Sequence, residues 1–90
     1  MSDEYNGWSN YETWNVNLWL SNDEPMYRHV STMASGWPDR WTDTMRAEFL
    51  APQIEEYVRG IAGGERFGDL SAPELERVDW IEIATAWIEE

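Results

Sequence analysis

The chain has 90 residues, with 18 acidic and six basic side chains, no lysine, no cysteine and a formal net charge of −12 at pH 7. This length allows one domain with a single modest core, and the lack of cysteine excludes disulfides and thiolate metal sites. Such a charge repels nucleic acid and anionic membranes and favours basic partners, although a GC-rich genome or a salt-loving host would produce the same composition. We expect a cytoplasmic protein without a membrane segment or direct nucleic-acid contact.

The first predicted helix lies within residues 7–23, which contain three tryptophans and four asparagines. Ser9 and Glu12 have the spacing of a capping box, so the helix should start there and run to about Leu20. Its apolar side chains fall on two sides, which is typical of a helix buried between neighbours. The alternation that begins at Trp14 also fits a strand, but the cap favours the helix.

Two further helices are expected in the middle of the chain. Pro25 suits the first turn of the second helix, and the Ser-Gly pair at 35–36 ends it. A third helix should begin near Trp41. Pro52 is expected to break or kink that helix, because the residue before a proline avoids helical angles. The helical pattern then continues to Gly63.

The last quarter contains two more capping patterns. Ser71 with Glu74, and Asp79 with Glu82, have the spacing in which a cap residue is followed three positions later by glutamate. They predict a short helix near 72–78 and a final helix from about Trp80 to Ile88.

These elements predict an all-α fold, a compact bundle of about five short helices in a single domain over residues 1–90. Residues 1–8 are its candidate flexible segment. The glycine cluster at 60–68 lacks the spacing of a phosphate-binding loop and indicates a flexible connection.

Tryptophan and asparagine together suggest how the core is built. Large aromatic side chains bury much area, and each buried indole N–H needs an acceptor, which Asn15 or Asn17 can supply. The predicted core residues are Trp14, Leu18, Trp19, Trp80 and Trp87. The alternative function for tryptophan is that of an exposed binding anchor, and Trp37 and Trp41 are the candidates.

Two segments carry a resemblance to a known family. The stretch WSNYETWNVNLW at 8–19 resembles the N-terminal signature of a family of small uncharacterised acidic proteins found in phage, plasmid and archaeal genomes, and VDWIEIA at 78–84 is similar to its C-terminal signature. The resemblance implies a mobile-element origin. It implies no activity, so no functional residue is carried over.

We expect no catalytic site, metal site or cofactor. A cysteine nucleophile and a Schiff-base lysine are impossible here, and the single histidine, His29, is expected to be a partly exposed helix residue. Carboxylate pairs such as Asp39/Asp43 and Glu55/Glu56 lack the spacing of a calcium loop. An enzyme that uses carboxylates alone is the weakest of three function hypotheses.

The leading hypothesis concerns the acidic last quarter. Carboxylates three or four residues apart on a helix rise about 4.5–6 Å, which is commensurate with DNA phosphates at about 3.4 Å per strand step. The predicted partner-binding residues are Glu74, Glu76, Asp79, Glu82, Glu89 and Glu90. The protein would be a non-enzymatic mobile-element protein that binds a basic surface of a host nucleic-acid-binding protein by DNA mimicry, as an anti-restriction or anti-CRISPR inhibitor does.

An alternative function for the protein and a purely structural role for these carboxylates both remain open. The protein would instead be a small interaction or regulatory module that uses the Trp37–Trp41 loop, with its acidity serving solubility or adaptation to salt. The carboxylates would then form a solvated helix face, with Asp79 and Glu82 used for capping. The sequence leaves the oligomeric state open.

Overall fold

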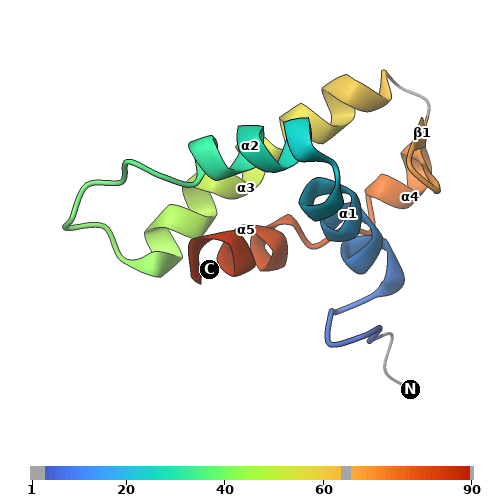
Figure 1. Cartoon of the computed structure of the whole chain (residues 1–90). Helices are drawn as coiled ribbons and strands as arrows, with labels where there is room; N and C mark the ends of the chain where they lie inside the picture. Colours follow the sequence, from blue (N-terminus) through green and yellow to red (C-terminus); the bar gives the residue numbers. More distant parts are fainter. Residues whose placement is uncertain (1–3, 64–65, 90) are drawn as a thin grey trace.

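The computed structural model describes residues 4–63 and 66–89. Within them the chain forms five helices and a short hairpin (Figure 1). In chain order these are α1 (Tyr11–Asn22), α2 (Glu24–Met33), α3 (Asp43–Ala62), β1 (Arg66–Phe67), β2 (Leu70–Ser71), α4 (Ala72–Leu75) and α5 (Trp80–Glu89). The prediction of a small, mostly α-helical domain is confirmed.

The core lies where α3, α5 and α1 meet. α3 and α5 form the most extensive helix pair, while α1 packs against both α2 and α5, and α2 lies alongside α3 (Figure 1). Leu50 and Ile54 of α3, Ile83 of α5, and Val16 and Leu20 of α1 are fully buried. Because each such side chain contributes about 1.5–3 kcal/mol when it leaves water, this contact supplies much of the stability of the fold.

α1 begins one residue later than the sequence predicted. Its N-cap is Asn10, whose Oδ1 accepts a hydrogen bond from the Thr13 amide at 2.9 Å. Ser9 is therefore not the cap, because its hydroxyl donates to Glu82 at 2.7 Å instead. The helix ends at Asn22, and the next residue, Asp23, caps α2 by accepting from the Met26 amide.

Of the two outcomes predicted at Pro52, a break in the third helix is wrong, because α3 continues through the proline as one element. Proline removes the amide that would bond to the carbonyl of Glu48. Both residues are exposed, so water can satisfy that carbonyl. Ala51 and Ile54, on either side of the proline, are buried and hold the helix in the core.

The predicted flexible connection contains ordered structure where it is described. β1 and β2 pair antiparallel, with Phe67 opposite Leu70, and both of these side chains are buried. Gly68 turns the chain with a positive φ of 58°, a conformation that favours glycine. A hairpin therefore replaces a loop, because its two apolar residues join the core.

The core prediction is wrong for Leu18 and Trp19, which are 37% and 40% exposed. Of the apolar side chains of α1, Val16 and Leu20 face the core, whereas Leu18 and Trp19 remain on the surface. The indole of Trp19 lies over the hairpin at Gly68, where an added Cβ would sit 2.2 Å from Nε1.

The other predicted core residues occupy three different environments. Trp87 is buried, and its indole N–H donates to Asn17 Oδ1 at 2.9 Å, a carboxamide pairing of the kind that the sequence suggested. Trp80 is partly buried against the core. Trp14 is partly buried in a cluster with the rings of Tyr5 and Tyr11.

Candidate functional site

The start of α1 and the start of α5 are joined by polar contacts that we call the α1–α5 junction, formed by Ser9, Asn10, Thr13, Asp79 and Glu82. Thr13 is fully buried. Its hydroxyl donates to Asn10 Oδ1 at 2.6 Å and accepts from the Asp79 amide at 2.9 Å. The two segments that resemble family signatures therefore meet in space, and their polar residues hold the two helices together.

Asp79 and Glu82 both have structural partners in this junction. Asp79 Oδ1 accepts from the Glu82 amide at 3.0 Å and so caps α5, as the sequence predicted. The Glu82 carboxylate does not accept a hydrogen bond from the Asp79 amide, because that amide already donates to the Thr13 hydroxyl. Glu82 Oε1 instead accepts from the Ser9 amide and hydroxyl at 3.1 and 2.7 Å. Hydrogen bonds thus fix the orientation of both carboxylates.

Replacing Thr13 by valine is expected to lower the free energy of unfolding by about 1–3 kcal/mol, because the Asp79 amide loses its buried acceptor. Thr13→Ser keeps the hydroxyl and is the matched control. Urea denaturation of both variants tests the junction. A loss in Thr13→Ser without a loss in Thr13→Val would show that the methyl group matters rather than the hydrogen bond.

Glu74 is held locally. Its Oε1 accepts from the Ser71 amide at 3.0 Å and the Ser71 hydroxyl at 2.9 Å, which confirms the predicted capping box of α4. These bonds, the Ser71 amide first, and the nearby charge of Arg66 lower the pKa of Glu74. A lowered folded-state pKa stabilises the fold above the usual glutamate range, and that contribution is lost as the pH falls through it.

Ion pairs with arginine involve other carboxylates. In the described part of the chain they join Glu24 with Arg28, Glu55 with Arg59 at 2.8 Å, and Glu12 with Arg77 at 3.3 Å. These pairs lie on α1, on α2, on α3 and in the turn before α5. The described residues of the predicted acidic row take no part in these ion pairs.

The structure brings three residues of that row onto one side of α5, which we call the α5 edge: Asp79, Glu82 and Glu89. Glu82 and Glu89 are two helical turns apart, a rise of about 10.5 Å, and both line a shallow hollow of about 480 Å³ with Trp8. Glu74 and Glu76 belong to α4 and to its end and are not on this helix. Glu90 lies outside the described residues.

The Trp37–Trp41 loop contributes to a second surface, which we call the aromatic cluster, formed by Trp37, Trp41 and Phe49. The two indoles stack with centroids 5.7 Å apart, and Phe49 packs edge-on against them at 5.8 and 5.4 Å. Trp37 is anchored, since its Nε1 donates to the Ala34 carbonyl. Both indoles are partly buried, whereas Phe49 is 52% and neighbouring Met45 46% exposed.

Phe49 and Met45 were not among the predicted binding residues. The sequence did place Trp41, Met45 and Phe49 on one helix face, because they are four residues apart. The missing information was that Leu50 and Ile54 form the buried face of α3. The spacing alone does not tell which of two apolar rows faces water.

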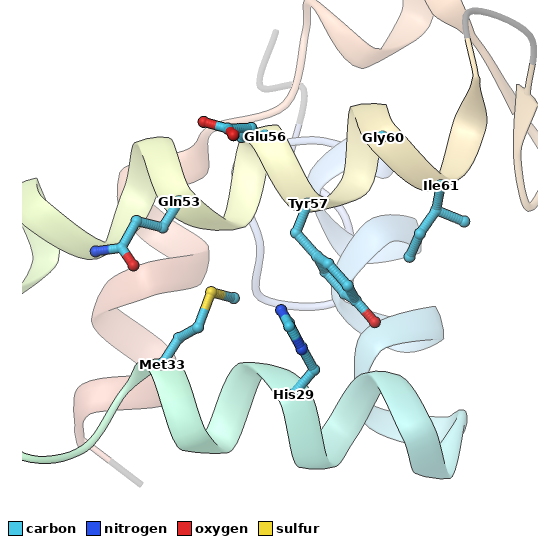
Figure 2. A pocket seen from close by; sticks show the side chains of 7 residues that line it. All are labelled: His29, Met33, Gln53, Glu56, Tyr57, Gly60 and Ile61. Carbon is cyan, nitrogen blue, oxygen red and sulfur yellow. The ribbon is translucent and has the colours of Figure 1, made fainter.

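A third surface is the hollow between α2 and α3, about 460 Å³ in volume (Figure 2). Across it the imidazole of His29 stacks on the Tyr57 ring, with centroids 4.1 Å apart and planes at 16°. Met33 and Gln53 lie toward one end and Ile61 toward the other (Figure 2). His29 is exposed, in keeping with the helix-surface position expected for it.

The described residues contain neither a group of metal ligands nor a membrane-spanning helix. Among residues 4–63 and 66–89, no cluster of three or more histidine or acidic side chains could bind a metal ion. The helices in the described ranges are too short or too polar to cross a bilayer.

The fold and its surfaces define a small, strongly acidic, mostly helical domain whose candidate sites are shallow surface hollows. The chain belongs to a family of unknown function (DUF7249), whose model matches residues 1–89. Membership of an uncharacterised family agrees with the expectation drawn from the sequence. Neither the curated proteins nor the solved structures gave a match.

Proposed function

We propose that the protein is a non-enzymatic binding protein whose acidic surface occupies the basic, nucleic-acid-binding surface of another protein. The supporting observation is the α5 edge. Ser9 and the α5 backbone orient Asp79 and Glu82, while the arginine ion pairs engage other carboxylates. Charges that are already oriented lose less freedom on binding, and they keep their negative charge for a partner.

The spacing of the α5 edge suits a basic surface that normally holds phosphates. Asp79 and Glu82 are separated by a rise of about 4.5 Å, and Glu82 and Glu89 by about 10.5 Å. The longer interval equals about three phosphate steps along one DNA strand. On this proposal the protein acts in the host cytoplasm as a mobile-element DNA mimic of the anti-restriction or anti-CRISPR kind.

The proposal predicts binding that duplex DNA and salt both weaken. A tagged copy incubated with host lysate should retain nucleic-acid-binding proteins, and added duplex DNA or a rise from about 50 to 200 mM salt should release them, as it releases DNA itself. Mass spectrometry of the retained proteins is the measurement. If neither added DNA nor salt reduces retention, DNA mimicry is excluded.

Charge-removal variants locate this surface. Glu76→Gln with Glu89→Gln removes two exposed charges of the predicted acidic row, one at the end of α4 and one on the α5 edge, without touching the α1–α5 junction. The matched control, Glu24→Gln with Glu55→Gln, changes net charge equally but removes ion-paired carboxylates. We expect about a tenfold loss of affinity in the first pair, equivalent to about 1.4 kcal/mol, and a much smaller loss in the control. Equal losses would mean that only net charge matters.

A second candidate function is supported by the exposure of the aromatic cluster. Aromatic side chains dominate the energetics of protein interfaces, and Phe49 is half exposed while it contacts both indoles. If this surface makes the contact, Trp41→Ala with Phe49→Ala should abolish retention although the net charge is unchanged. If the α5 edge makes it, the same variant should retain the partner.

A further inference from the structure

α3 carries a second apolar row on the side away from the core. Trp41, just before the helix, and Met45 and Phe49 within it are spaced four residues apart, so they follow one another along the helix surface. Glu48 and Glu56 are eight residues apart in the neighbouring row, about 12 Å along the axis. Both glutamates are exposed, and the described ion pair of α3 uses Glu55 instead.

Each of these glutamates lines a hollow beside an aromatic ring. Glu48 borders a hollow of about 320 Å³ together with Trp41, Met45 and Phe49. Glu56 borders the hollow between α2 and α3, next to Tyr57 (Figure 2). Both hollows on α3 therefore place a carboxylate beside an aromatic ring. The one at Glu48 is lined mainly by apolar side chains, whereas in the one at Glu56 the His29 imidazole already stacks on one face of Tyr57.

This combination fits an arginine side chain. A guanidinium group stacks on aromatic faces and also forms two parallel hydrogen bonds with a carboxylate. Lysine matches it less well, because its ammonium group is compact and strongly hydrated. Two hollows at successive positions of one helix, each bordered by a carboxylate, suit a partner helix that presents side chains at regular helical intervals.

We propose that this face of α3 docks an amphipathic helix of a partner protein, whose apolar side covers Met45 and Phe49 and whose arginines pair with Glu48 and Glu56. Charge complementarity selects this occupant. A second copy of the chain would bring another net charge of −12 to the same glutamates, and such charge opposes self-association. The inference rests on the second candidate function above and names the chemistry of its partner, and it does not depend on the α5 edge.

The test uses a synthetic amphipathic helical peptide of about four turns, with arginine and leucine at four-residue intervals. Its binding to the full chain is measured by fluorescence anisotropy at about 0.15 M salt, where weak surface electrostatics are screened. Phe49→Ala and the pair Glu48→Gln/Glu56→Gln should each weaken binding about tenfold, as expected for central interface residues. The same peptide with lysine in place of arginine should bind more weakly.

The matched control is Glu12→Gln with Glu24→Gln, which removes the same charge from α1 and α2, outside both candidate surfaces, and should leave the affinity nearly unchanged. Circular dichroism of each variant checks that the helices persist, which is expected because the replaced residues on α3 are exposed.

Three outcomes would overturn the proposal. Equal losses of peptide affinity in the control and in the α3 pair would show that binding depends only on net charge. Equal affinity for the lysine peptide would exclude guanidinium recognition. Sedimentation of the free chain as a dimer that Phe49→Ala dissociates would make a second copy the occupant. None of these results bears on the DNA-competition experiment, whose variants lie at Glu76 and Glu89.

Discussion

Replacing Gly68 by alanine should lower the free energy of unfolding by about 2–4 kcal/mol, from backbone strain and overpacking together. Gly68 has a φ of 58°, a conformation that costs a residue with a Cβ about 1–2 kcal/mol. The new Cβ would also lie 2.2 Å from Trp19 Nε1. The indole must then leave the hairpin, and its contact with the turn is lost. Urea denaturation followed by circular dichroism measures the change.

The same substitution in a Trp19→Ala background separates the two causes. Without the indole, only the backbone cost of about 1–2 kcal/mol should remain. The difference between the two backgrounds is the interaction energy of the pair. A loss of equal size in both would show that Trp19 does not restrict this position and that the turn alone requires glycine.

Replacing Trp87 by alanine should be the most damaging single change, with a loss of about 3–5 kcal/mol. The side chain is 7% exposed and belongs to the core between α5 and its neighbours. Its ring also contacts that of Tyr27, with centroids 5.4 Å apart. Truncation leaves a cavity that the surrounding helices fill incompletely. Thermal and urea unfolding both report this loss.

Trp87→Phe tests the polar part of the same contact. Phenylalanine keeps most of the apolar volume but cannot donate to Asn17, so we expect a loss of about 1–2 kcal/mol. Asn17→Ala should cost a similar amount in the natural chain and much less once Trp87 is already phenylalanine. Additive losses in the double variant would contradict a direct contribution from the hydrogen bond at 2.9 Å.

Prediction from sequence worked best for interactions within a few residues. The Ser71–Glu74 capping box formed as predicted, and Asp79 caps α5. The capping box at Ser9 failed although its spacing was equally good. Asn10 was the better cap, and Glu82, 73 positions away, supplied Ser9 with another acceptor.

The candidate surfaces were predicted less completely. The acidic row was found as a set of residues, but Asp79 and Glu82 also hold the α1–α5 junction, a role that depends on Thr13 of another helix. Trp37 and Trp41 were identified as a possible contact, whereas Phe49 was not. Its exposure depends on which side of α3 packs against α5, and the four-residue spacing of Trp41, Met45 and Phe49 does not encode that choice.

The sequence by itself determined the helical class, the charge, the helix ends set by glycine and by the local caps at Ser71 and Asp79, and membership of a family of unknown function. Tertiary structure decided that Leu18 and Trp19 face outward, that α3 continues through Pro52, and that Phe67 and Leu70 join the core as a hairpin. Local rules act within one helical turn, where the interacting residues are near in sequence. Burial depends instead on which distant surfaces meet, so it follows from the packing of the whole chain.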